Sequence, residues 1–145
     1  MPRKPTTTAP AASTTSGIVI DGGEGGSGAA PQTLADHVSL PIAEALPRVV
    51  DALLEADLKD RVRVVASGKL VTSAKAAWAL CAGADFVNTA RGFTFALGCI
   101  QSLRCHTDRC PTGVTTQDPL RARALVVPLK VERVYSYHHA TLHAL

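Results

Sequence analysis

Three short apolar segments, each followed by small or polar residues, constrain the fold of this chain most. The segments are Gly17–Asp21, Arg61–Ala66 and Ala84–Asn88, and helical patterns separate them. Strands that alternate with helices in this way form parallel sheets with right-handed crossover connections. We therefore predict an α/β fold with about three parallel strands, whose C-terminal ends meet at one edge of the sheet.

Two helices are predicted between these strands. In the segment Pro41–Leu58, apolar residues recur at helical spacing, namely Val49, Val50, Leu53, Leu54 and Leu58. We expect Pro47 to kink this helix or to begin a new one, because proline disrupts a helix interior. The second helix is predicted to begin at Thr72 or Ser73 and to stop at Gly83.

The residues that follow each predicted strand are suited to ligand contact. Gly22–Pro31 holds five glycines in seven residues, which permit close approach of the backbone to a ligand; a flexible turn is the alternative. In the turns that follow the other two strands, Gly68 and the run Thr89, Ala90, Arg91 and Gly92 would bind a phosphate through backbone N–H groups, as the last strands of a (β/α)8 barrel often do. A complete barrel needs about 250 residues, so this chain has room only for the C-terminal portion of one.

The loop 98–116 contains three of the four cysteines, Cys99, Cys105 and Cys110, with the spacing C-x5-C-x4-C. Thiolates bind soft metals, and gaps of five and four residues let the loop wrap around a group larger than one ion. An iron–sulfur cluster fits this spacing best, because each iron takes its own cysteine. A Cys3His zinc site that includes His106 and free or redox-active thiols remain as alternatives.

Composition argues against several classes of protein. A net charge of +3 and an aromatic content of 4% are too low to indicate nucleic-acid binding. The sequence has no apolar run long enough to span a membrane. The uneven cysteine spacing is unlike a secreted disulfide framework, so we expect a cytoplasmic protein. Residues 1–16, rich in Pro, Thr, Ala and Ser, are predicted to be a disordered leader, and the folded domain is predicted to span 17–145.

The C-terminal part is predicted to be helical and to cover the cysteine loop. A short helix begins at Asp118 or Pro119 and runs to Leu125. A second helix carries one apolar stripe, formed by Val131, Val134, Tyr135, His138 and Leu142. His139 and His143 are four residues apart on one face, but exposed helix histidines are the preferred interpretation over a metal site.

From Gly17 onward the chain resembles the FMN-binding glutamate synthase family. The resemblance rests on the stretches DGGEGGSGAAP, RVRVVASGKLVT and GADFVNTARGFTFALGCIQSLRCHTDRCPTGVTTQ. It implies the C-terminal part of a (β/α)8 barrel that binds FMN and a three-iron, four-sulfide (3Fe–4S) cluster. In that family the barrel converts 2-oxoglutarate and ammonia to L-glutamate through 2-iminoglutarate. FMN delivers the hydride, and the cluster relays electrons to the flavin.

The resemblance also implies which residues bind the cofactors. The Gly-rich loop would lie over the FMN and substrate pocket, with Gly22, Gly23, Gly25, Gly26 and Gly28. Two strand-end turns would bind the FMN phosphate, with Ser67, Gly68, Asn88, Thr89, Ala90, Arg91 and Gly92. The ligands of the cluster would be Cys99, Cys105 and Cys110.

The chain also departs from the family. The upstream strands that hold 2-oxoglutarate and the glutaminase domain of the large enzymes are missing, and Ser67-Gly68-Lys69 replaces the Asp-Gly-Gly common in those enzymes. We expect a truncated reading frame or one half of a split gene. The polypeptide is expected to be inactive alone. Its open strand edges are expected to pair with a partner chain that supplies the rest of the barrel. The alternative function is a non-catalytic zinc- or iron–sulfur-binding module or subunit.

Overall fold

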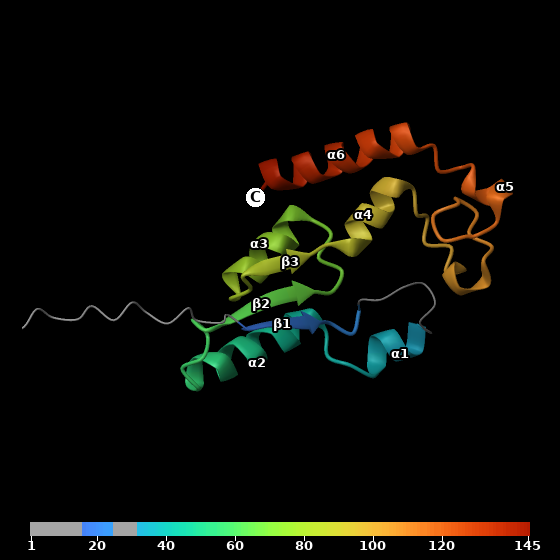
Figure 1. Cartoon of the computed structure of the whole chain (residues 1–145). Helices are drawn as coiled ribbons and strands as arrows, with labels where there is room; N and C mark the ends of the chain where they lie inside the picture. The colour runs from blue at the N-terminus through green and yellow to red at the C-terminus, as the bar shows by residue number, and fades with distance from the viewer. Residues whose placement is uncertain (1–15, 25–31) are drawn as a thin grey trace, which may run out of the picture.

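The computed structural model describes residues 16–24 and 32–145. A three-stranded parallel sheet has the order β1-β2-β3 (Figure 1), formed by β1 (Ser16–Asp21), β2 (Val62–Ser67) and β3 (Phe86–Asn88). The predicted parallel strands are confirmed, with β1 beginning one residue earlier than expected. In the register, Asp21 lies opposite Ser67, and Ser67 lies opposite Asn88. The last residues of the three strands therefore form one row at the C-terminal edge of the sheet.

One face of the sheet carries the hydrophobic core. The helices α2 (Ile42–Glu55) and α3 (Ser73–Cys81) contribute to one cluster with β2, in which Leu46 and Val64 are completely buried. The other face carries a row of paired residues, Val19, Val65 and Phe86, of which Val19 is 62% and Phe86 59% exposed. A sheet with one buried and one exposed apolar face matches the wall of a partial barrel, where the uncovered face would be the interior.

The ends of the two core helices follow the sequence closely. The Thr72 side chain accepts a hydrogen bond from the Lys75 N–H (3.3 Å) and caps α3. Gly83 has a left-handed φ of +101° just after this helix, as a helix-terminating glycine should. The expectation of a new helix start at Pro47 is wrong, because Pro47 lies inside the continuous helix α2. A short helix, α1 (Gln32–His37), was not predicted.

An ion-pair cluster fixes the segment before β3 against β2. The Asp85 carboxylate accepts hydrogen bonds from the Val64 N–H (2.8 Å), Lys59 Nζ (2.9 Å) and Arg63 Nη1 (2.9 Å). The bond from Val64 is the main cause that lowers the pKa of Asp85 to about 2, against the opposing effect of burial and with the help of both cations. The charged form of Asp85 therefore stabilises the fold.

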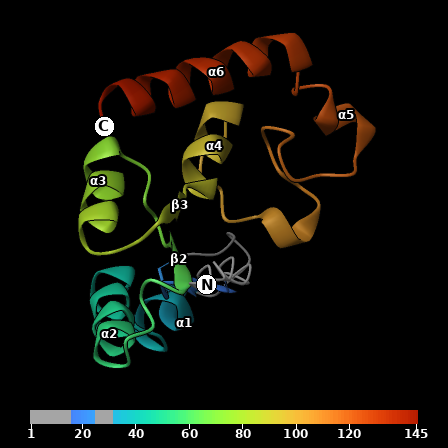
Figure 2. The ribbon, with the colours of Figure 1, turned by 60° about the vertical axis from the view of Figure 1, so that its left-hand side comes forward.

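Four further elements follow β3: α4 (Ala90–Leu97), the 3-10 turn η1 (Cys105–Thr107), α5 (Pro119–Ala122) and α6 (Val127–His143). Figure 2 shows α4 between the sheet and α6. Asp118 caps α5 through the Leu120 N–H (2.9 Å), as expected, although this helix ends before Leu125. In the part of the chain that the structure describes, no helix is both long and apolar enough to cross a membrane.

The predicted packing stripe of the last helix is confirmed only in part. Of its members, Val131, Tyr135 and Leu142 are exposed. The side of α6 that is half-buried carries Lys130, Val134, Tyr137 and Thr141. Polar contacts decide this orientation, because the Tyr137 hydroxyl forms hydrogen bonds with residues before and after β3. His138, His139 and His143 are exposed, as predicted.

Candidate functional site

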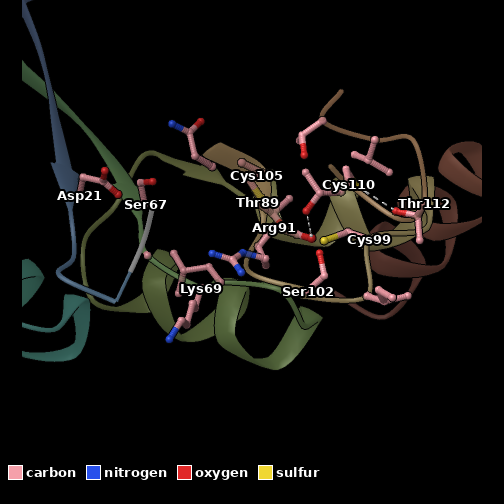
Figure 3. A pocket seen from close by; sticks show the side chains of 18 residues that line it. Asp21, Ser67, Lys69, Thr89, Arg91, Cys99, Ser102, Cys105, Cys110 and Thr112 are labelled. Atoms are coloured by element: carbon pink, nitrogen blue, oxygen red, sulfur yellow. Dashed lines mark hydrogen bonds between the residues drawn. The ribbon is translucent and has the colours of Figure 1, made fainter. Parts of the chain in front are cut away.

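A cavity of about 420 Å³ lies at the C-terminal edge of the sheet. One part of its wall is the row of strand ends, Asp21, Ser67 and Asn88. Another part comes from the cysteine loop, and Figure 3 shows the strand ends on one side and the three cysteines on the other. The parallel register thus brings residues from four separate parts of the sequence to one site.

The turn after β2 contributes backbone more than side chain to this cavity. Gly68 has φ +146°, and a Cβ at this position would lie 3.0 Å from the Cβ of Ile42. A larger residue would therefore strain the turn and crowd the first residue of α2. Lys69, next in the chain, also has a positive φ of +46° and lines the cavity.

The first turn of α4 lies beside the turn after β2. Thr89, Ala90 and Arg91, which were predicted to bind a phosphate, line the cavity. Thr89 is the N-cap of the helix, yet its side chain makes no capping hydrogen bond. Its hydroxyl instead lies 2.9 Å from the Tyr137 hydroxyl of α6. A helix N-terminus that faces a cavity carries partial positive charge and backbone donors, which favour an anion.

Three of the predicted glycines lie away from the cavity wall. Gly92 lies under the side chain of Tyr137, where a Cβ would overlap the tyrosine hydroxyl. Gly22 donates a backbone hydrogen bond to the Ser67 carbonyl (2.7 Å), and Gly23 donates one to the Leu40 carbonyl (2.8 Å). The first bond holds the end of β1 to the end of β2, and the second holds it near the start of α2. The remaining predicted glycines, Gly25, Gly26 and Gly28, lie outside the described residues.

Glu24 of the same loop caps α2. Its two carboxylate oxygens accept the Ile42 N–H at 3.1 and 2.9 Å. An acidic side chain at a helix N-terminus satisfies a backbone donor and complements the helix dipole. The N-terminus of α2 is thereby occupied by the chain itself, which leaves α4 as the helix whose start faces the cavity.

The cysteines of the predicted cluster all line the cavity. Cys99 and Cys105 are half-buried and Cys110 is buried. Burial raises the pKa of the Cys110 thiol, but hydrogen bonds with Thr112 and Thr115 outweigh burial and lower this pKa to about 6. The thiolate, which is the form that binds metals, is thus favoured at Cys110 at neutral pH.

The cysteine loop is held in shape by its own hydrogen bonds. Asp108 has φ +60°, and its carboxylate accepts bonds from the Thr116 hydroxyl (3.0 Å) and the Gln117 N–H (2.5 Å). The Thr107 hydroxyl donates to the Arg104 carbonyl at 2.8 Å. These contacts join the middle of the loop to its C-terminal end and hold the part that carries Cys105 and Cys110 in shape.

The other metal-binding side chains lie elsewhere. His106 is exposed and is not part of the cavity wall. Cys81, the fourth cysteine, is exposed on α3. Within residues 16–24 and 32–145, no group of three His, Cys, Asp or Glu side chains is close enough to hold a single metal ion. A 3Fe–4S cluster differs from one ion because its cysteines each bind a different iron.

Several residues of the cavity wall were not predicted to belong to the site. They are Asp21, Lys69, Leu70, Thr94, Ile100, Ser102, Thr112, Val114 and Thr115. Asp21 was within reach of sequence reasoning, because it ends a strand at the edge where the other strand-end residues were assigned. Thr112 and Thr115 gave no signal in the sequence, since only the fold of the cysteine loop brings them to the Cys110 thiol.

The chain is similar to known proteins over most of its length. Residues 4–145 match the family model described as a conserved region in glutamate synthase; the match begins within the predicted leader. The chain is 52% identical over 120 residues to the glutamate synthase large subunit-like protein YerD of Bacillus subtilis, covering 83% of this chain and 23% of that protein. It is 37% identical over 128 residues to the archaeal glutamate synthase [NADPH] of Methanocaldococcus jannaschii, covering 88% of this chain and 25% of that protein. The chain thus spans about a quarter of the length of these curated relatives.

Proposed function

Because this chain belongs to the glutamate synthase family, we propose that it forms the FMN phosphate site and the 3Fe–4S site of a glutamate synthase barrel. The reaction of that barrel would be the reductive conversion of 2-oxoglutarate and ammonia to L-glutamate. The observation that carries the proposal is a single cavity lined by two strand-end turns, the start of a helix and three cysteines. Such a cavity places a site for an anion beside a site for thiolate ligands.

The residues at the end of the sheet fit the phosphate end of FMN. Gly68 places no side chain at the first position after β2, and Ala90 adds only a methyl group at the start of α4. The backbone can therefore approach a phosphate closely, while the helix dipole favours its negative charge. Ser67 and Asn88 flank this position and would supply polar side chains.

The cysteine loop fits an iron–sulfur cluster. Its three thiols line the same cavity from three points of one loop that hydrogen bonds hold in shape. Cys99, Cys105 and Cys110 would each bind one iron. When bound, FMN would supply hydride transfer to the substrate and the cluster would supply one-electron transfer to the flavin. The protein's contribution is to hold the two groups in one cavity, so that electrons cross a short distance.

The remainder of the barrel would come from outside the described residues. The free edges of the sheet and the exposed row that contains Val19 and Phe86 would pair with further β/α units, in this polypeptide or in a partner chain. The residues that hold 2-oxoglutarate would belong to that part. We expect the 145-residue chain alone to be inactive and to work in the cytoplasm, where its cysteines remain free thiols or cluster ligands.

The test is anaerobic purification of the chain, followed by metal and sulfide analysis. About three irons and four acid-labile sulfides per chain, with broad visible absorption, would support the cluster. Separate Cys99→Ser, Cys105→Ser and Cys110→Ser variants should each lower the iron content. The matched control is Cys81→Ser, an exposed cysteine on α3, which should leave it unchanged.

Three outcomes would count against the proposal. Zinc in place of iron, lost in a His106→Ala variant, would support the alternative of a zinc-binding module. Iron content that falls equally in the Cys81→Ser variant would show that the metal is not bound by the cysteine loop. Turnover of 2-oxoglutarate by the isolated 145-residue chain would contradict the expected dependence on the rest of the barrel.

A further inference from the structure

Cys110 differs from the other two cysteines of the candidate cluster site in the surroundings of its sulfur. It is 6% exposed, whereas the other two are half-buried. The Thr112 hydroxyl lies 3.4 Å from the Cys110 sulfur (Figure 3), and Thr115 also forms hydrogen bonds with this sulfur. The Cys99 sulfur accepts a backbone bond, from the Gln101 N–H at 3.5 Å. Hydroxyl groups of the loop thus gather at the most buried of the three sulfurs.

A tight turn fixes the Thr112 hydroxyl beside this sulfur. The Gly113 N–H donates to the Cys110 carbonyl at 3.4 Å, which closes a four-residue turn with Pro111 and Thr112 at its central positions. Pro111 fixes its own φ, and Gly113 has φ +77°. A Cβ at Gly113 would overlap the Arg121 carbonyl oxygen of α5, so the turn packs directly against that helix. Thr112 is thereby held two residues after the cysteine, with little freedom to move away from it.

The direction of the bond between Thr112 and Cys110 follows from the chemistry of a bound cysteine. In the free thiol either atom can be the donor. A cysteine that binds iron does so as a thiolate, which has no hydrogen to donate. The Thr112 hydroxyl must then donate its hydrogen to the sulfur. Because Cys110 is buried, water competes little for this bond, and its electrostatic effect on the sulfur is strong.

We propose that Thr112 is a positioning residue for the cluster, because its hydroxyl donates to the Cys110 sulfur and thereby raises the reduction potential of a bound 3Fe–4S cluster. The reduced cluster carries one more negative charge than the oxidised cluster, so the hydrogen bond to a ligand sulfur is stronger in the reduced state. Hydrogen bonds to the sulfurs help to set the potential of such clusters for this reason. The inference rests on the proposed function, since it takes the three cysteines to bind this cluster.

The test is a redox titration of the full chain, loaded with iron and sulfide under anaerobic conditions. Dithionite supplies one electron per cluster, and electron paramagnetic resonance follows the oxidised cluster. In Thr112→Val, which replaces the hydroxyl with a methyl group, the equilibrium constant for reduction should fall by up to about tenfold, which is about 59 mV toward more negative potential. Thr112→Ser keeps a hydroxyl and should keep the original potential. Iron and sulfide contents should be the same in all variants.

Thr107→Val is the matched control in the same loop. The Thr107 hydroxyl donates to the Arg104 carbonyl at 2.8 Å and accepts the Arg109 N–H at 3.3 Å. This variant therefore removes contacts that shape the loop without removing the bond to the cysteine sulfur. Its potential should equal that of the original chain.

Three results would overturn the inference and leave the proposed function intact. They are an unchanged potential in a fully loaded Thr112→Val variant, an equal shift in Thr107→Val, and a shift in Thr112→Ser as large as that in Thr112→Val. Loss of iron from Thr112→Val would indicate a packing role and would also overturn it. An original chain that holds no cluster would refute the proposed function, and the inference with it.

Discussion

Replacing Gly83 with alanine should destabilise the chain strongly, for two reasons that the structure quantifies. Gly83 has φ +101°, a conformation in which a Cβ costs about 1–2 kcal/mol. The new Cβ would also lie 2.7 Å from one methyl group of Val50 and 3.0 Å from the other. Val50 belongs to the core cluster that includes Leu46 and Val64, so it cannot move without disturbing the packing of that cluster. Overpacking of this kind costs about 1–3 kcal/mol.

The expected loss in the free energy of unfolding is therefore about 2–5 kcal/mol for Gly83→Ala. Urea titration followed by circular dichroism at 222 nm measures it, provided that the slope of the transition is unchanged. Gly17→Ala is the matched control, because the nearest atom to its new Cβ is the Arg63 carbonyl oxygen at 3.7 Å. This control should change stability by less than about 1 kcal/mol. A loss for Gly83→Ala no larger than that of the control would refute the reasoning.

Three other predictions use the same titration. Leu46→Ala should lower the free energy of unfolding by about 2–5 kcal/mol because Leu46 is completely buried in the core. Leu54→Ala, on the exposed side of α2, should lower it by less than about 1 kcal/mol. At pH values above 3.8, the pKa of Asp85 in the unfolded chain, this carboxylate should contribute about 2 kcal/mol to the free energy of unfolding. The contribution should disappear as the pH falls toward the folded pKa of about 2. Asp85→Asn should lack this pH dependence, and a pH profile identical to that of the original chain would contradict the lowered pKa. Thr72→Ala should lower the free energy of unfolding by about 1 kcal/mol because it removes the cap of α3, and Thr72→Ser should restore most of this loss. Equal stabilities of the three proteins would contradict a contribution from the cap.

The sheet and its functional edge were predictable because the relevant signals are local. Each strand is a short apolar run bounded by glycine or polar residues. The hydrophobic pattern and these boundary residues are enough to place the strand in the sequence. Gly83 and Thr72 end and begin α3 through interactions with residues three or four positions away. The row of Asp21, Ser67 and Asn88 then follows from parallel pairing alone, which is why the cavity lies where the strand ends predicted it.

The errors arose where distant residues decide the structure. The apolar pattern of α6 favoured the side with Val131 and Tyr135, but the helix packs through Tyr137, whose partners belong to other elements. Gly92 looked like part of a ligand turn, although its missing side chain makes room for that tyrosine. Neither feature has a periodicity in the sequence, because each depends on the contact between α4 and α6.

The bond between Tyr137 and Val71 has a consequence for the order in which the chain folds. The two residues are 66 positions apart, whereas the strands and helices of the β/α units join nearer neighbours. Closing a longer loop costs more chain entropy, and nonlocal contacts form more slowly. We therefore expect the start of α4 to reach its final geometry after β2 and α3 have formed. The edge of the cavity would then be the last part of this domain to acquire protection during refolding.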